Sequence, residues 1–212
     1  MRAESLSSLE DVKRGGEIVK DEELLQGFLG GDEKSFVELM QRYKQPILTF
    51  VYRFIGDYDD ATDIAQETFV RLYRFAHTFK GEVKFSTWLY TIAANLSRSE
   101  LKRYRRRMGT ALSAAFSRDE AGEEWDVPDE TYRPDDKVDS NRIAQEVQAA
   151  LMKISPTYRE MVILRDIQQM SYEEIAFVTG TEMGTVKSRI NRGRAQLQEL
   201  LQGLYDEVFG TE

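Results

Sequence analysis

The sequence predicts an all-α protein with two small helical domains joined by a flexible acidic linker. Apolar residues recur every three or four positions on both sides of a central segment, and no strand-like alternation persists. In the central segment this periodicity stops, and glycine, proline and acidic residues gather instead. With 212 residues, 41% of them hydrophobic, the chain has room for two small cores. The expected parts are an extension at 1–20, a first domain at 21–108, the linker at 109–136, a second domain at 137–206 and a tail at 207–212.

The first domain is expected to contain three helices. The first helix follows an apolar stripe of residues three or four positions apart: Phe36, Met40, Tyr43, Ile47, Phe50 and Phe54. Pro46 lies within this stripe and is expected to bend the helix. The second helix begins at the acids of 57–60, which suit the positive end of a helix dipole. The third begins near Ser86 and buries Trp88.

The second domain is expected to open with a helix at 141–153. Ser155 and Pro156 then have the pattern of an N-cap followed by proline at the first helical position. The segment at 171–194 has the sequence SYEEIAFVTGTEMGTVKSRINRGR, in which two short helical patterns flank one glycine. This segment predicts a helix-turn-helix.

Several features of the helix-turn-helix agree with one another. Ser171 and Glu174 have the spacing of a capping box, and Gly180 supplies the left-handed backbone of a tight turn. Val186 and Ile190 face inward from the second helix. Its opposite face presents polar and cationic residues: Thr185, Lys187, Ser188, Arg189 and Arg192. A major groove admits one helix and offers acceptors to arginine and lysine, so we expect this face to bind duplex DNA. The alternative is a surface hairpin with solvated arginines.

A second cationic surface follows the third helix of the first domain. The ten residues from 98 to 107 include six cations and one acid, more than the helix dipole explains. Asn95, Arg98, Lys102 and Arg105 fall at spacings of 3, 4 and 3 and therefore share one face. We expect this face to meet phosphates.

The loop before this helix sets aromatic residues beside cations. Its members are Phe79, Lys80, Lys84, Phe85 and Trp88. Aromatic rings stack on unpaired bases while cations follow the backbone, so the pattern is typical of single-strand binding. Taken singly, Phe85 and Trp88 fit the core better.

The helix that begins at 57–60 carries its acids early and its bases late. Asp63 and Glu67 lie on one face and are followed by Arg71. This order stabilises a helix through its dipole, and Glu67–Arg71 is a favourable i,i+4 pair. On spacing alone this is a solvated face.

Composition excludes several classes of site. The chain has no cysteine and one histidine, His77, which removes disulfides, thiolate metal sites and histidine-based triads. No stretch approaches the ~20 apolar residues that span a bilayer, and the N-terminus lacks an apolar leader. We therefore expect a cytoplasmic protein without membrane insertion, metal or cofactor. The net charge of −8 argues against general nucleic-acid adhesion.

Three stretches, in this order, resemble the extracytoplasmic-function (ECF) sigma factors of the sigma-70 family: DDATDIAQETFVRLYRF, FSTWLYTIAANLSRSELKRYRRR and LRDIQQMSYEEIAFVTGTEMGTVKSRINRGRAQL. The resemblance covers 22–201. It implies a protein that binds core RNA polymerase and directs it to promoters through their minus-35 and minus-10 elements. It also implies promoter melting and transcription initiation without catalysis by this chain.

The resemblance implies a role for each surface. Core polymerase binding falls on the acidic helix: Asp60, Asp63, Gln66 and Glu67. Minus-10 DNA binding falls on the aromatic loop and the cationic helix: Phe79, Lys80, Lys84, Phe85, Asn95, Arg98, Lys102, Arg103, Arg105 and Arg106. Minus-35 DNA binding falls on the helix-turn-helix and one upstream arginine: Arg165, Thr185, Lys187, Ser188, Arg189, Asn191 and Arg192.

The resemblance also bears on the linker and on partners. The linker has nine acids between 119 and 136, which would mimic nucleic acid in cationic channels of the polymerase; a plain spacer is the alternative. An anti-sigma factor is expected as a partner by family analogy, because exposed binding faces need restraint.

Two other functions remain as alternatives. A free-standing repressor or activator would use only the helix-turn-helix, and would leave the second cationic surface unexplained. An enzyme acting on nucleic acid would need clustered carboxylates at metal-binding spacing. Asp57, Asp59 and Asp60 come nearest to that pattern and fit a helix start better.

Overall fold

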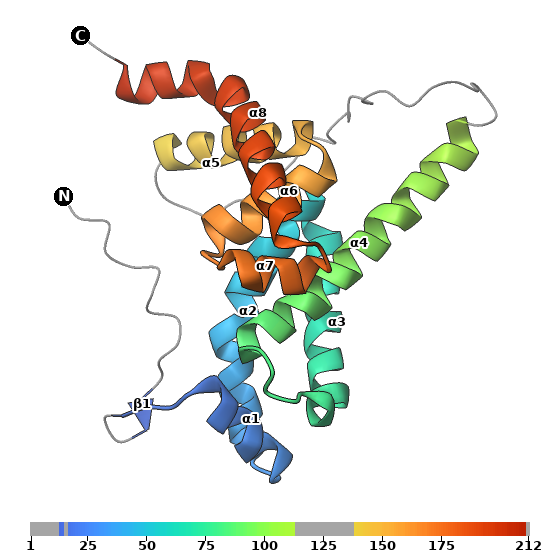
Figure 1. Ribbon diagram of the computed structural model, residues 1–212, viewed down its shortest axis with the longest axis vertical. Helices are drawn as coiled ribbons and strands as arrows, with labels where there is room; N and C mark the ends of the chain where they lie inside the picture. Colours follow the sequence, from blue (N-terminus) through green and yellow to red (C-terminus); the bar gives the residue numbers. More distant parts are fainter. Residues whose placement is uncertain (1–12, 15–16, 113–137, 211–212) are drawn as a thin grey trace.

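The computed structural model describes residues 13–14, 17–112 and 138–210, and within them it is almost entirely helical (Figure 1). Its strands, β1 (Lys13–Arg14) and β2 (Glu17–Ile18), form a single antiparallel ladder of two residues each. The predicted all-α fold class is confirmed. The acidic linker from 113 onward and most of the N-terminal extension lie outside the described residues.

The first domain is built from α1 (Asp21–Leu29), α2 (Glu33–Ile55), α3 (Tyr58–Phe75), the short 3-10 turn η1 (Ala76–Thr78) and α4 (Phe85–Leu112). The helix α2 continues through Pro46, so proline does not end it. Gly56, with a φ of 92°, closes α2, and Asp57 then caps α3 by accepting from the Asp60 N–H at 2.8 Å. Gly56 and Asp57 thus form the turn between α2 and α3.

The core of the first domain lies along the predicted stripe of α2. Ile47, Phe50 and Phe54 are buried, and the Phe50 ring meets the Tyr90 ring of α4 edge-on with centroids 5.5 Å apart. The predicted stripe of α2 therefore lies in or against the core, and α4 packs on it.

A buried polar cluster attaches α1 to α2. Arg42 Nη1 lies 2.5 Å from Asp21 Oδ1 and 3.1 Å from the Val19 carbonyl, while the Tyr43 hydroxyl donates to the other Asp21 oxygen. Burial raises the pKa of Asp21, and the hydrogen bonds from Tyr43 and Arg42 oppose that rise.

The second domain consists of α5 (Val138–Lys153), α6 (Pro156–Val162), the π-helical turn η2 (Ile163–Ile167), α7 (Tyr172–Thr179) and α8 (Met183–Phe209). The capping box of α7 is confirmed, with Ser171 N–H donating to Glu174 Oε2 at 2.7 Å and Glu174 N–H donating to Ser171 Oγ at 3.2 Å. Gly180 ends α7 with a φ of 62°, as the turn requires. The helix-turn-helix is therefore present.

The two domains pack against each other. In Figure 1, α7 lies across α4, and α6 lies close to the end of α2. Arg159 of α6 is completely buried there and donates to the Phe54 carbonyl at the end of α2 at 2.8 Å. It also donates to the Met152 and Ile154 carbonyls, and burial lowers its pKa to about 10, so it stays protonated at neutral pH. Buried apolar residues of both domains consequently form one continuous cluster.

Candidate nucleic-acid and polymerase interfaces

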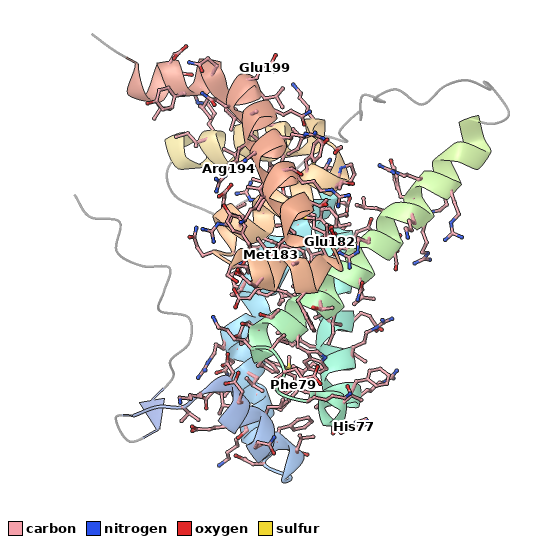
Figure 2. The ribbon with its side chains drawn as sticks, viewed as in Figure 1. His77, Phe79, Glu182, Met183, Arg194 and Glu199 are labelled. Atoms are coloured by element: carbon pink, nitrogen blue, oxygen red, sulfur yellow. The ribbon has the colours of Figure 1, made fainter. Side chains whose placement is uncertain are left out.

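The exposed face of α8 carries most of the predicted minus-35 residues. Lys187, Ser188, Asn191 and Arg192 are exposed, whereas Thr185 and Arg189 are half-buried. Val186 and Ile190 are buried on the opposite face and hold the helix against the domain. Figure 2 shows Glu182 and Met183 at the turn where α8 begins, with Arg194 and Glu199 farther along the same helix.

The upstream arginine, Arg165, and Lys187 of the α8 face both lie against the ring of Tyr172. Arg165, on η2, has its guanidinium carbon 4.9 Å from the centroid of the Tyr172 ring, and Lys187 Nζ lies 5.7 Å from the same centroid. Arg165 also donates to the Met170 carbonyl at 2.7 Å. The structure thus brings Arg165 next to the recognition helix. Sequence reasoning did not identify Tyr172; its only signal was its place directly after the N-cap.

The far half of α4 presents the cationic stripe. It projects away from the rest of the protein in Figure 1, and Lys102, Arg103, Arg105 and Arg106 are exposed along it. Glu100 forms ion pairs with Arg103 and with Arg107, each at 2.8 Å. The cations of this run remain exposed to solvent, including the two that pair with Glu100.

The aromatic loop requires a correction to the predicted minus-10 set. Phe85 is completely buried and packs edge-on against Tyr43, with centroids 5.5 Å apart. It is a core residue, since burying its ring in the domain leaves no face for a base. Phe79 is half-buried between Phe85 and Trp88, whereas Lys80 is exposed.

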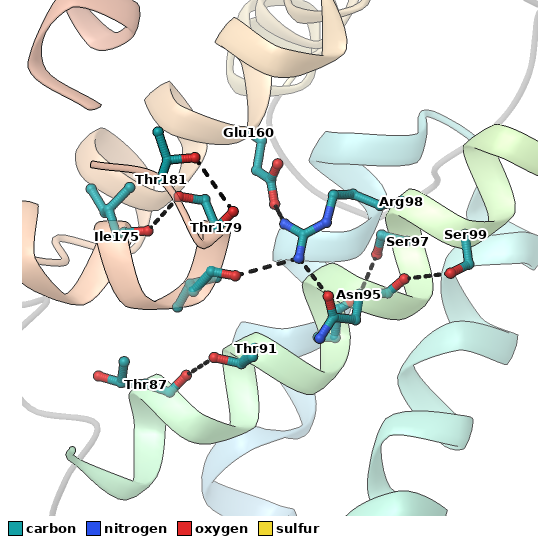
Figure 3. A network of polar contacts seen from close by, with 12 residues as sticks. Thr87, Thr91, Asn95, Ser97, Arg98, Ser99, Glu160, Ile175, Thr179 and Thr181 are labelled. Carbon is teal, nitrogen blue, oxygen red and sulfur yellow. Dashed lines mark hydrogen bonds and ion pairs between the residues drawn. The ribbon is translucent and has the colours of Figure 1, made fainter. Parts of the chain in front are cut away.

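Two of the remaining minus-10 candidates, Arg98 and Lys84, contact the second domain. Figure 3 shows the Arg98 guanidinium between Glu160 of α6, the Asn95 side chain and the helix-turn-helix. Arg98 forms an ion pair with Glu160 and donates to Asn95 Oδ1 at 2.6 Å. Burial raises the pKa of Glu160, and Arg98 opposes that rise. Lys84 Nζ forms a second ion pair, 3.0 Å from Glu174 Oε1.

The acidic face of α3 borders an apolar groove. Asp63 and Gln66 are exposed, Asp60 is half-buried, and Glu67 pairs with Arg71 at 2.9 Å. Burial, together with the nearby Asp57, raises the pKa of Asp60. The groove, of about 680 Å³, lies between α2 and α3, and Gln66 contributes to its wall. Its other lining residues are mainly apolar: Phe36, Met40, Leu48, Tyr58, Ala65, Phe69, Val70 and Tyr73.

Fold and surfaces together define a two-domain DNA-binding protein whose helix-turn-helix and second cationic helix belong to different domains. Models of known families match both parts: Sigma-70 region 2 over residues 39–107, and Sigma-70 region 4 over residues 144–197. Within the described ranges, no helix is long and apolar enough to cross a membrane.

Curated relatives agree with the family models. The ECF RNA polymerase sigma factor SigW of Bacillus subtilis is 33% identical over 175 residues, which cover 82% of this chain and 92% of SigW. SigE of Mycolicibacterium smegmatis, also an ECF sigma factor, is 35% identical over 167 residues, which cover 79% of this chain but only 62% of SigE. The chain belongs to the ECF sigma factors of the sigma-70 family. Its two matched regions are those of promoter recognition and transcription initiation.

Two solved structures resemble this chain across both domains. One is the sigma factor RpoE of Bartonella quintana in complex with the anti-sigma factor NepR, with 27% identity and a TM-score of 0.62 over 80% of this chain and 98% of that one. The other is CnrH in complex with the cytosolic domain of CnrY, with 26% identity and a TM-score of 0.61 over 86% and 97%.

Proposed function

We propose that this protein binds core RNA polymerase, recognises promoters through both elements and promotes strand opening. The observation that carries the proposal is the presence of two cationic surfaces on different domains, one on α8 and one on α4. The α8 face suits duplex minus-35 DNA, since Lys187 and Arg192 are exposed on a helix of groove-binding form. The end of α4 suits the minus-10 element. Unstacking a base costs a few kcal/mol, which stacking and hydrogen bonds on this surface would offset.

The same proposal assigns the acidic face of α3 and its apolar groove to core polymerase. Asp63 and Gln66 are exposed beside a groove whose wall includes the exposed Val70 and Tyr73. An anti-sigma factor is proposed as a further partner, because the similar sigma factor RpoE was solved in complex with the anti-sigma factor NepR. The linker, by its charge, would follow cationic channels of the polymerase.

Run-off transcription with purified core polymerase tests the function as a whole. The protein should comigrate with core in gel filtration, and the reconstituted enzyme should start defined transcripts on fragments of the genome that encodes it. Core polymerase alone is the control. Failure both to bind core and to start any transcript would contradict the proposal and favour a free-standing regulator.

Replacing Arg192 with alanine should weaken binding to duplex minus-35 DNA about tenfold, as expected for one lost arginine contact in a groove. Arg192 is exposed on α8 and is not among the residues that line the groove between α2 and α3, so core binding should be unchanged. Fluorescence anisotropy with labelled duplex measures the first quantity and gel filtration with core the second.

Arg194→Ala is the matched control for this measurement. Arg194 is also exposed on α8, but its guanidinium pairs with Asp166 on η2. It lies outside the proposed contact set, so its loss should change duplex binding much less. Equal losses in the two variants would show that Arg192 has been assigned wrongly.

A further inference from the structure

Two cations from different elements of the second domain lie against one aromatic ring. Tyr172 is the first residue of α7, and its side chain is half-buried against the core. The guanidinium carbon of Arg165, on η2, and Nζ of Lys187, on α8, lie 4.9 and 5.7 Å from the centroid of this ring. Both distances fall within the ~6 Å at which a ring face attracts a cation. One ring is therefore shared by the two elements that carry the proposed minus-35 residues.

The backbone before α7 holds Arg165 close to this ring. Arg165 lies in the π-helical turn η2, and such turns are frequent at functional sites. Gln169 follows η2 with a φ of 56°, a left-handed conformation that is uncommon for residues other than glycine. The Arg165 guanidinium donates to the Met170 carbonyl at 2.7 Å, and the Met170 N–H donates to the Leu164 carbonyl at 3.0 Å. These two hydrogen bonds close the turn, so the position of Arg165 is fixed by the fold.

A ring holds a cation differently from a carboxylate. Arg194, on the same helix as Lys187, pairs with the Asp166 carboxylate, which compensates its charge. An aromatic ring attracts a cation through its quadrupole, so Arg165 and Lys187 keep their full charge. The attraction also offsets part of the repulsion between the two cations. Two cations that are fixed in place with their charge intact suit the phosphates and base acceptors of duplex DNA.

We propose that Tyr172 is a positioning residue for minus-35 recognition. Its ring fixes Arg165 and Lys187, which come from η2 and α8, as one preformed contact for duplex DNA. The ring acts through these two cations, so the Tyr172 hydroxyl is not required. The DNA part of this inference rests on the proposed function, whereas the shared ring contact does not.

Ring-current shifts test the contact without DNA. In NMR spectra of the full chain, side-chain protons of Arg165 and Lys187 that lie over the ring should be shifted upfield. Tyr172→Phe retains an aromatic face and should keep these shifts, whereas Tyr172→Leu should remove them. Ordinary shifts in the parent chain would overturn the inference.

Affinity for duplex DNA tests the positioning role. The probe is the tightest duplex that the parent chain selects from a random pool, so it does not depend on a known promoter. Tyr172→Leu should weaken binding of this duplex about fivefold, as expected for two exposed cation–π contacts. Tyr172→Phe should stay within about twofold of the parent chain, since phenylalanine also attracts cations. Equal losses in the two variants would assign the effect to the hydroxyl and overturn the positioning role.

A mutant cycle distinguishes a ring that acts through the cations from a ring that binds DNA itself. In a chain that carries both Arg165→Ala and Lys187→Ala, the ring has no cation left to position. Tyr172→Leu should then change duplex affinity less than about twofold, measured at low salt, where the weakened binding stays detectable. A full loss that persists in this background overturns the proposal, because the ring would then act without the two cations.

Controls separate positioning from folding. Phe177→Leu removes an exposed ring from the same helix, five positions farther on and on another face, and should leave duplex binding unchanged. Urea unfolding reports whether Tyr172→Leu is folded. If it is not, Tyr172→Met is used, since methionine fills irregular gaps without a ring.

The outcomes distinguish the positioning role from the function. If the parent chain selects a duplex and both Tyr172 variants bind it as the parent does, the positioning role is wrong, and run-off transcription can still succeed. If no duplex is selected although the ring-current shifts are present, the proposed minus-35 binding fails, and the positioning role fails with it. If run-off transcription fails while Tyr172→Leu alone loses duplex affinity, the positioning role holds and the proposed sigma function is wrong.

Discussion

Arg42→Ala should lower the free energy of unfolding by about 3–5 kcal/mol, the loss typical when one partner of a buried ion pair is removed. The Arg42 side chain is only 2% exposed and contacts the carboxylates of Asp21 and Glu38 and the Val19 carbonyl. Without Arg42, the Asp21 carboxylate would still be buried and would still accept from the Tyr43 hydroxyl, but no ion pair with Arg42 would compensate its charge. Urea unfolding followed by circular dichroism measures the difference.

The pH dependence of this loss has a defined sign. Burial already raises the pKa of Asp21, and Arg42 opposes the rise, so removing Arg42 raises this pKa further. A carboxyl whose pKa is raised by folding destabilises the folded state when it is ionised. The penalty of the variant should therefore be largest at neutral pH and shrink as the pH falls through the pKa of Asp21 in the folded variant.

Arg71→Ala is the matched control for Arg42→Ala. Arg71 also pairs with a carboxylate, that of Glu67 at 2.9 Å, but both side chains are about half exposed. An exposed i,i+4 pair contributes at most about 0.5 kcal/mol. Similar losses in the two variants would contradict the buried cluster that attaches α1 to α2.

Signals confined to a few residues were predictable from the sequence. The capping box of Ser171 and Glu174, the Asp57 cap and the turn at Gly180 each depend on neighbours within one helical turn. Spacing likewise predicted that Val186 and Ile190 would be buried beneath an exposed cationic face. These local features are sufficient to predict the helix-turn-helix without reference to contacts between the domains.

Features that depend on distant partners were not predictable. Arg159 is buried because the Phe54 carbonyl lies opposite it, 105 positions away in the chain. Arg98 and Glu160, 62 positions apart, meet only when the domains pack. Sequence spacing placed Arg98 correctly on one face of α4 but could not show what covers that face. Phe85 taken singly was expected in the core, as the structure has it, and its assignment to DNA came from the family resemblance of the whole loop.

Gly193→Val should destabilise the second domain by about 3 kcal/mol, the upper end of the usual cost of overpacking. A Cβ at this position would lie 2.7 Å from Val162 Cγ2 and 3.3 Å from both the Cβ and the backbone oxygen of Tyr158. The last atom belongs to the backbone of α6, so a rotamer change cannot relieve the contact. Because α8 would be pushed from α6, duplex minus-35 binding should fall together with the unfolding midpoint.

Gly203→Ala provides the control on the same helix. No heavy atom lies within 4 Å of a Cβ built at Gly203, so alanine adds no contact there. It should raise stability by about 0.5–1 kcal/mol, because glycine is a poorer helix former than alanine. Valine, like alanine, is a better helix former than glycine, so a loss of stability at Gly193 beside a gain at Gly203 would point to local packing. If Gly193→Val were as stable as Gly203→Ala, the close crossing of α6 and α8 would be wrong, and with it the position given to the recognition helix.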